Sequence, residues 1–193
     1  MKKIVSIKKL TDRKYLNLYE VIYETEKGEK KYEVVSRKKV IDIMSKTKNA
    51  DAVRIIPYFY DKNGNLKVVL IREFRYAIND YIFGVPAGLI DEGESPKTAA
   101  KRELKEEIGA RVIEIEQTEK ASYSSAGMSD ESIICFEAEV EIDAKQQLDE
   151  FEDIKLKVVD LNELEKMLNK EKFGLQSRLQ LRSFLYKQKY LEK

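Results

Sequence analysis

The sequence predicts an α/β protein in which a mixed β-sheet is flanked by helices and follows an antiparallel β appendage. Two observations predict this fold class. Stretches of β-branched and aromatic residues recur along the chain and are interleaved with only a few helical stretches. Residues 1–48 show strand patterns but carry too little apolar surface to fold alone. The chain of 193 residues is 42% apolar, which allows one sizeable core with an appendage.

The N-terminal region, residues 1–48, is predicted to contain a β-hairpin. Its first strand is "YLNLYEVIYET" (15–25) and its return strand is "YEVVSRK" (32–38), with a turn around Gly28. We expect this hairpin to pack on the rest of the chain or on a second subunit. The polar stretch "KTKNAD" (46–51) is the best boundary, and it divides the chain into an appendage (1–48) and a main domain (49–193).

The main domain is predicted to open with a second hairpin. Its strands, "AVRIIPYFY" (52–60) and "LKVVLIREF" (66–74), flank an Asn63-Gly64 turn. A short strand, the loop "VPAGLIDEGES" (85–95) and a helix follow. Further strands are expected at 111–123, 131–142 and 154–160, joined by the loops 124–130 and 143–153, and two helices close the chain at about 161–169 and 175–190.

Composition excludes several classes of chemistry. The chain has no histidine and a single cysteine, so Ser-His-Asp and Cys-His catalysis and zinc sites built from His or Cys are excluded. A catalytic metal would need oxygen ligands, which favours Mg²⁺, Mn²⁺ or Ca²⁺, and a general base would be Glu or Asp. The 36 basic and 35 acidic residues nearly cancel, so charge gives no reason to expect nucleic acid or a membrane as partner. A reducing cytoplasm is the expected compartment.

The helix over 96–108 has clear signals at both ends. Ser95 is a good N-cap, Pro96 fits the first helical position, and Gly109 suits the C-terminal stop. Apolar residues recur every four positions and form a core-facing stripe: Ala100, Leu104 and Ile108.

Three carboxylates gather along this stripe. Glu103 and Glu107 lie side by side at i and i+4, and Glu106 lies on the same flank, further out, within reach of Arg102. At the edge of a core, desolvation makes their mutual repulsion costlier, and a divalent cation would turn the cluster into a site. The alternative, for an isolated acidic stretch, is a solvated helix face with its lysines compensating the charge.

The surrounding sequence favours the metal site. "GLIDEGESPKTAAKRELKEEIGA" (88–110) has Gly88, five residues, Glu94, seven residues, and then R-E-L-K-E-E-I-G ending at Gly109. This pattern resembles the Nudix box, and all seven fixed identities stand at the right spacing. The resemblance implies the Nudix fold and Mg²⁺- or Mn²⁺-dependent hydrolysis of a nucleoside diphosphate linked to another group. It implies these roles: Glu103 and Glu107 as metal ligands, Glu106 as a further ligand or positioning group, Arg102 to orient the carboxylates, Gly88 to allow a tight loop, and Glu94 to brace that loop.

More of the chain resembles the ADP-ribose pyrophosphatase branch of this family. "VPAGLIDEGE" resembles that branch's entry to the box, which implies that the carbonyl of Ala87 also binds metal. "REFR" (72–75) resembles a pattern that ends in a phosphate-binding arginine, here Arg75, with Glu73 where glutamine is common. Arg54, on a neighbouring strand, is a further candidate for substrate phosphates. The N-terminal region resembles one through which those enzymes form homodimers.

The loop "DEFEDIKL" (149–156) resembles the one that supplies the catalytic base in that branch. The resemblance implies that Glu150 is the base and Glu152 a metal ligand, with the reverse assignment left open. One position departs from the branch: Ala126 stands where a proline commonly marks ADP-ribose specificity. ADP-ribose or a related nucleoside diphosphate sugar is therefore the expected substrate. The alternatives are a regulator that binds a nucleotide sugar without cleaving it and a nucleoside triphosphate pyrophosphohydrolase.

Overall fold

The computed structural model describes residues 3–38 and 50–191, and these fall into two compact units. The first unit combines the N-terminal region up to Asp51 with the segment Ala121–Ile133, and the second combines Ala52–Lys120 with Ile134–Lys193. The predicted boundary at 46–51 lies mostly outside the described residues. The division into residues 1–48 and 49–193 therefore stays a prediction.

The second unit is built on a seven-stranded sheet, counted over the described residues. The strand order is β10-β5-β4-β9-β8, with β6 paired to β5 and β7 paired to β4. The strands span Ala52–Tyr60 (β4), Leu66–Arg75 (β5), Asp80–Gly84 (β6), Ala87–Leu89 (β7), Ala110–Tyr123 (β8), Ser132–Ile142 (β9) and Ile154–Asp160 (β10). β5 lies antiparallel to β4, β6 and β10, so it is held on both sides.

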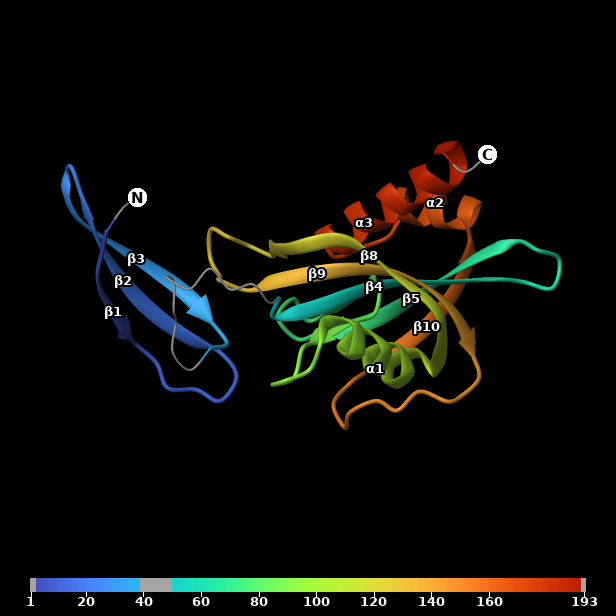
Figure 1. The fold of residues 1–193 in the computed structure, drawn as a ribbon, viewed down its shortest axis with the longest axis horizontal. Helices are drawn as coiled ribbons and strands as arrows, with labels where there is room; N and C mark the ends of the chain where they lie inside the picture. Colours follow the sequence, from blue (N-terminus) through green and yellow to red (C-terminus); the bar gives the residue numbers. More distant parts are fainter. Residues whose placement is uncertain (1–2, 39–49, 192–193) are drawn as a thin grey trace. The chain divides into compact units, whose positions relative to one another are not determined.

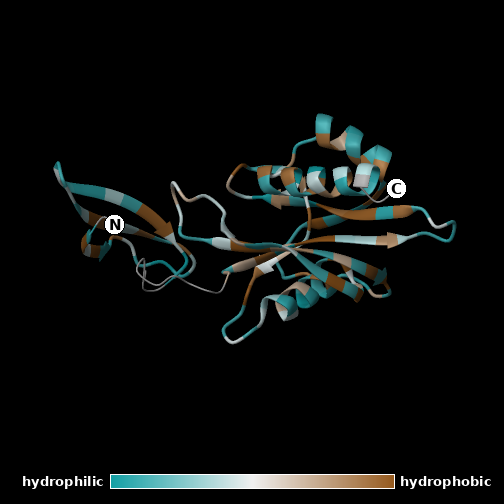
Figure 2. Cartoon of the chain, turned by 45° about the horizontal axis from the view of Figure 1, so that its top comes forward, coloured by the Kyte–Doolittle hydropathy of each residue, from teal (hydrophilic) through white to brown (hydrophobic). Residues whose placement is uncertain are grey.

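Helices cover both faces of this sheet (Figure 1). Helix α1 (Pro96–Ile108) packs on β4 and β7, whereas α2 (Leu161–Lys170) and α3 (Leu175–Tyr186) lie on the opposite face. The core under α2 and α3 is made by alternate residues of the strands, and hydrophobic stretches of the strands and helices face each other in Figure 2. It includes Ile56, Val68, Leu70, Val159, Leu164, Leu168, Leu181 and Phe184.

The caps predicted for α1 are confirmed. The Ser95 side chain accepts a hydrogen bond from the Thr98 amide, and Pro96 occupies the first turn. Gly109 ends the helix in the left-handed conformation, at φ 63°. The core stripe is also confirmed, because Ala100, Leu104 and Ile108 are fully buried.

Three features differ from the sequence-based expectation. The stretch 87–89, expected as loop, pairs with β4, an element too short and too glycine-rich to show a strand pattern. A lysine-rich strand, β1 (Lys3–Lys9), precedes the predicted hairpin. The last helix ends at Tyr186 and continues as a five-residue π-helix, Lys187–Leu191.

The first unit is a three-stranded antiparallel sheet with a small core. Its strands are β1, β2 (Asn17–Thr25) and β3 (Gly28–Ser36), in that order. Tyr19, Val21 and Val34 form its buried centre. The loop 124–130 belongs to this unit, because the Tyr32 hydroxyl donates to the Gly127 carbonyl at 2.6 Å and the Val35 amide donates to the Met128 carbonyl at 2.9 Å. Among the described residues, no helix is long and apolar enough to cross a membrane.

Candidate active site

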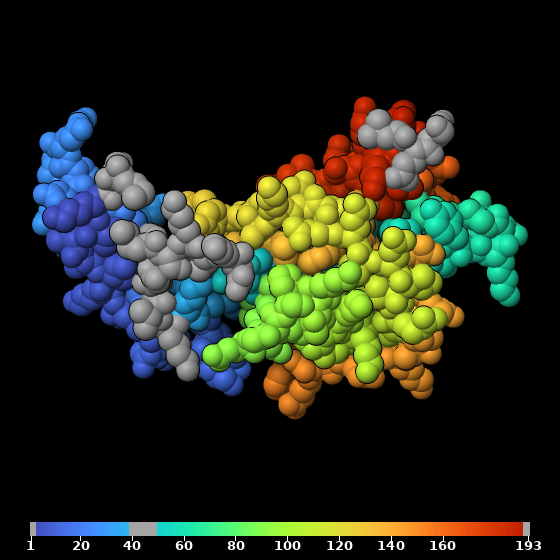
Figure 3. Space-filling model, in the orientation of Figure 1, coloured from blue at the N-terminus to red at the C-terminus, as the bar shows by residue number. Residues whose placement is uncertain are grey.

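The carboxylate-bearing helix α1 presents its outer side to solvent, where Figure 3 shows it in green on the visible face. Its lysines lie on that side, and Glu103 and Glu107 turn inward, with only 8% and 5% of their surfaces exposed. Glu106 is half-buried, between the exposed lysines and the two buried glutamates. The separation of charges around the helix follows directly from the i, i+4 spacing in the sequence.

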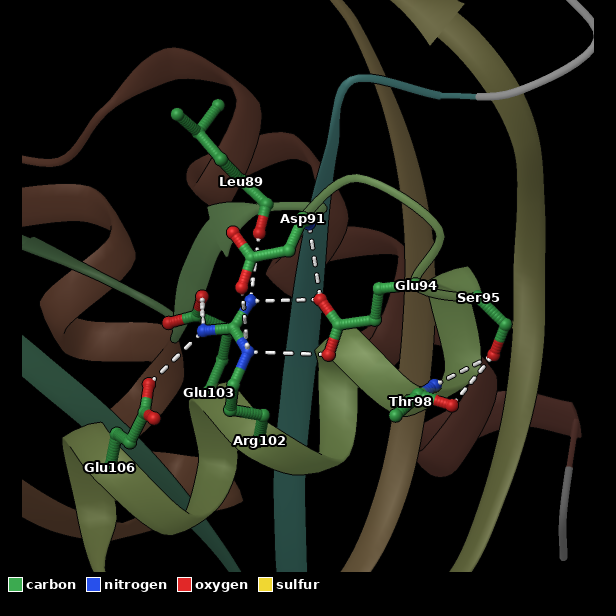
Figure 4. A network of polar contacts seen from close by, with 8 residues as sticks. All are labelled: Leu89, Asp91, Glu94, Ser95, Thr98, Arg102, Glu103 and Glu106. Carbon is green, nitrogen blue, oxygen red and sulfur yellow. Dashed lines mark hydrogen bonds and ion pairs between the residues drawn. The ribbon is translucent and has the colours of Figure 1, made fainter.

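Arg102 is the centre of the polar network in Figure 4. Its guanidinium binds both carboxylate oxygens of Glu94, at 3.2 and 3.1 Å, and donates to the Leu89 carbonyl at 2.9 Å. Its remaining nitrogen donates to Glu103 at 2.7 Å and to Glu106 at 3.1 Å. A planar guanidinium with five N–H donors can make all of these contacts at once, whereas the single ammonium group of a lysine cannot. Arg102 therefore ties the loop before α1 to two of the helix carboxylates.

Gly88 makes room for the Glu103 carboxylate. A Cβ atom added at Gly88 would lie 2.0 Å from Glu103 Oε1, well inside any allowed contact. The carboxylate therefore rests directly on the backbone of β7. Burial raises the pKa of Glu103, and Arg102 opposes this by stabilising the charged form.

Glu107 is the most deeply placed acidic group of the cluster. Its Oε2 atom is buried and has no hydrogen-bond partner among residues 3–38 and 50–191, whereas the carboxylate does accept a hydrogen bond from the Ala87 amide. Burial, followed by the neighbouring charges of Glu103, Glu73 and Glu152, raises its pKa to about 9. A buried carboxylate oxygen with no donor is the kind of atom that a cation satisfies.

The loop 143–153 is fastened to the C-terminal end of α1. The amides of Asp143 and Ala144 donate to the Gly109 carbonyl, and the Gln147 amide donates to the Glu106 carbonyl at 2.7 Å. The Gln146 side-chain amide donates to the Glu107 carbonyl at 2.6 Å and to the Ile154 carbonyl at 3.3 Å. Gln146 thus bridges α1 and β10, a role that no sequence pattern predicted.

The two candidate acids of this loop differ in their settings. Glu152 accepts a hydrogen bond from the Asp149 amide at 3.0 Å, and its charge contributes to the raised pKa values of Glu103 and Glu107. Glu150 lies on the same turn, and both acids are exposed. The structure brings Glu152 near the helix carboxylates, and the assignment of base and ligand stays a prediction.

The available donors fit an oxygen-binding divalent cation, because they are carboxylates and include the buried Oε2 of Glu107. As the side chains lie, no three acidic groups in residues 3–38 and 50–191 converge closely enough to hold an ion. Glu103 and Glu152 are instead bonded to Arg102 and to the Asp149 amide.

The two candidate phosphate-binding arginines have different surroundings. Arg75 lies at the end of β5 with half of its side chain exposed, and it forms an ion pair with Glu73 at 2.7 Å. Arg54 donates to Gln176 of α3 at 2.6 Å, so its side chain lies on the α2–α3 face of the sheet. The structure therefore places Arg75, but not Arg54, with a member of the acidic cluster. Their binding of substrate stays a prediction.

Glu73 is the site residue to which sequence reasoning gave no role. It was noted only as standing in place of a common glutamine. In the fold, its charge raises the pKa of Glu107, and Glu152 in turn raises the pKa of Glu73. The alternation of side chains along β5 is the sequence feature that places Glu73 on the α1 face of the sheet.

Comparison with known proteins identifies the family of this chain. The family model described as "NUDIX domain" matches residues 48–179. The chain is 33% identical over 104 residues to the ADP-ribose pyrophosphatase of Bacillus subtilis (strain 168), which covers 53% of this chain and 56% of that protein. It is 45% identical over 64 residues to the ADP-sugar pyrophosphatase of Mus musculus, which covers 33% of this chain and 29% of that protein. The matched segments thus span only part of these relatives.

A solved structure shows the same fold over nearly the whole chain. It is described as the crystal structure of ADP compounds hydrolase, and it matches with a TM-score of 0.73 at 21% identity, covering 97% of this chain and 96% of that one. This likeness confirms the predicted fold class of a mixed sheet with helices. Because the family model covers more than half of the chain and includes the whole box, the protein belongs to the Nudix family.

Proposed function

We propose that this protein hydrolyses the diphosphate bond of ADP-ribose or a related nucleoside diphosphate sugar, using Mg²⁺ or Mn²⁺. The observation that carries the proposal is the buried, unpartnered Oε2 of Glu107 within the intact box. Relatives whose names state ADP-ribose or ADP-sugar hydrolysis support the substrate class. The alternation of charges on α1 supports the metal site, because inward carboxylates repel unless a cation is bound.

A bound divalent cation supplies neutralisation of the diphosphate oxygens and activation of a water molecule. The residues that would hold it are Glu103, Glu107, Glu152 and the Ala87 carbonyl. Arg102 fixes Glu103 through their 2.7 Å contact, so the helix carboxylates keep one orientation. Arg75, at the end of β5, is the proposed binding group for the charged oxygens of the substrate.

The reaction itself is a hydrolysis. The oxygen of water bonds to one phosphorus, the bridging P–O bond breaks, and the bridging oxygen leaves on the other phosphate. ADP-ribose would thus give AMP and ribose phosphate. Glu150, exposed on the loop 143–153, is the proposed acceptor of the proton from water.

A hydrolysis panel tests the proposal. We expect turnover of ADP-ribose or another nucleoside diphosphate sugar in the presence of Mg²⁺, whereas dinucleotides and nucleoside triphosphates serve as comparison substrates. Glu107→Gln should lower kcat roughly 10²–10³-fold, the scale seen when one preorganised charged group is lost from a site. Circular dichroism checks that the variant is folded. Wild-type rates in that variant would contradict the metal-site assignment. Nucleotide binding without turnover by the wild type would favour a regulator.

We also propose that residues 1–48 mediate a homodimer. The described part of this region exposes several large apolar side chains, and β1 lies at one edge of its sheet. The exposed residues are Val5, Ile7, Leu10, Tyr15 and Leu16. A second copy of the chain is the occupant expected for this surface from the family resemblance.

A further inference from the structure

The alternation of β5 places Glu73 on the face of the sheet that carries α1. Successive side chains of a strand point to opposite faces. Val68 and Leu70 belong to the core under α2 and α3, so Val69, Ile71, Glu73 and Arg75 share the other face. Glu73 is thus directed to the side on which α1 packs against β4 and β7.

The strand register brings Glu73 close to the loop that carries Glu152. Glu73 pairs with Ile154 of β10, and directly paired residues of antiparallel strands point to the same face. The Phe74 amide also donates to the Asp153 carbonyl at 3.2 Å, so the end of β5 is fastened to this loop. Glu152 belongs to this loop, two residues before β10 begins at Ile154.

Glu73 is also largely removed from solvent. Its side chain is 18% exposed, and its contact with Arg75 is a short ion pair at 2.7 Å. A carboxylate in this position has lost most of its hydration and has one cation beside it. Glu103 and Glu107 belong to α1, which packs on this face, and the cations Arg102 and Arg75 contact Glu103 and Glu73.

The buried Oε2 of Glu107 is an independent sign that a ligand belongs among these groups. Glu107 is only 5% exposed, and this oxygen has no donor in the described residues. Glu107 belongs to α1, and Glu73 is directed to the face of the sheet on which α1 packs. Two like charges in a dry site are stable together only with a cation between or beside them.

We propose that Glu73 is a further metal-binding carboxylate of this site, contributed by β5 in addition to the carboxylates of α1 and the loop 143–153. The inference rests on the proposed function, because it adds a ligand to the metal site of that function. It also predicts that the Arg75 ion pair and the cation compete for the same carboxylate, since the pair occupies one oxygen of Glu73.

Binding of Mn²⁺ alone tests the inference without any substrate. Isothermal titration and the electron paramagnetic resonance signal of free Mn²⁺ give the stoichiometry and Kd. Glu73→Gln should weaken Mn²⁺ binding by roughly tenfold or more, at the scale found when groups around a metal site are removed. Glu92→Gln is the charge control, because it removes one carboxylate from the exposed loop before α1, and it should leave Kd unchanged.

Two more variants separate the outcomes. Arg75→Gln removes the competing cation, so its Mn²⁺ affinity should equal or exceed that of the wild type. If Arg75→Gln weakens binding as much as Glu73→Gln does, or if Glu73→Gln binds Mn²⁺ like the wild type, the inference is overturned. Glu107→Gln tests the site itself. If that variant also keeps full Mn²⁺ affinity, the proposed function fails together with its metal site, which is a distinct result.

Discussion

At the scale of single residues, the carboxylates of the site differ in the number of hydrogen-bond donors that contact them. Arg102 contacts Glu94, Glu103 and Glu106, whereas Glu107 depends on one backbone amide. The acidic groups are thus unequal, although the sequence presents them as a repeat. The inequality comes from depth, because Glu107 is the most deeply buried of these carboxylates.

Glu107 is expected to lower the stability of the protein at neutral pH when metal is chelated. Its pKa in the folded chain is about 9, above the ordinary 4.5, so the folded state holds this proton more tightly than the unfolded chain. The resulting contribution to stability is complete below about pH 4.5 and is lost as pH rises toward 9. In EDTA at pH 8, Glu107→Gln should therefore raise the free energy of unfolding, by about 1–3 kcal/mol.

Denaturant unfolding of both proteins at pH 4 and pH 8 measures this difference. The advantage of the variant should shrink at the lower pH, where Glu107 is protonated in the unfolded wild-type chain as well as in the folded one. A variant that is equally destabilised at both pH values would show that burial of this charge is not what limits stability. Glu92→Gln is again the matched control, because Glu92 is exposed.

Gly88→Ala is expected to damage the metal site and leave the fold intact. The new Cβ would meet the Glu103 carboxylate at 2.0 Å, so that side chain must move off the backbone of β7. Mn²⁺ affinity should fall at least about tenfold. Gly174→Ala is the control, since a Cβ there meets only Ile82 at an ordinary 3.8 Å. Titration of Mn²⁺ against both variants decides the matter, and equal affinities would place the Glu103 carboxylate outside the site.

At the scale of elements, the site depends on the junction between α1 and the loop 143–153. Gly109 is required there twice, because it adopts φ 63° and because an added Cβ would lie 2.2 Å from the Ala144 carbonyl. The loop thus passes directly over the helix end and satisfies its last carbonyl groups. This contact sets how far Glu150 and Glu152 lie from the helix.

Gln146→Ala is expected to loosen that junction. The change removes the hydrogen bonds to the Glu107 and Ile154 carbonyls, which should cost about 1 kcal/mol of stability and lower kcat more than it changes KM. Hydrogen exchange of the segment 147–153 should rise. Gln147→Ala is the matched control, because Gln147 is exposed and its contact with Glu106 uses the backbone. If hydrogen exchange of this segment is unchanged in Gln146→Ala, Gln146 does not hold the loop to the helix.

At the scale of the whole molecule, the N-terminal region is the part of the chain to which we assign dimerisation. Deletion of residues 1–48 should convert the proposed dimer to a monomer, as measured by sedimentation velocity. The deletion also removes the partners of the loop 124–130, whose Gly127 and Met128 carbonyls accept bonds from β3. A gentler variant is therefore needed beside it.

Val5→Lys with Ile7→Lys places charge on the exposed apolar side of β1 while keeping all strands. The same dissociation is expected, with hydrolysis assayed in parallel. A truncated or charged protein that stays dimeric would refute the assignment of dimerisation to this region. Lys30→Glu, at the far strand from β1, controls for a change of surface charge.

The sequence by itself determined the box helix and its carboxylates. Caps, core stripe and the neighbouring positions of Glu103 and Glu107 depend on residues within one helix, so spacing alone is sufficient. The Arg102–Glu106 pair was predictable for the same reason. The family pattern gave Glu94 only the role of bracing the loop, and its pairing with Arg102 is a finding of the structure.

The tertiary structure alone decided which distant residues join that helix. Glu73 reaches the site through strand alternation and the register of β5 with β10, and Gln146 reaches it through a loop that crosses the helix end. Arg54, which lies on a strand beside the site in sequence terms, turns to α3 instead. A shift of one residue in a strand exchanges its faces, and this choice is made by the packing of the whole sheet rather than by any local pattern.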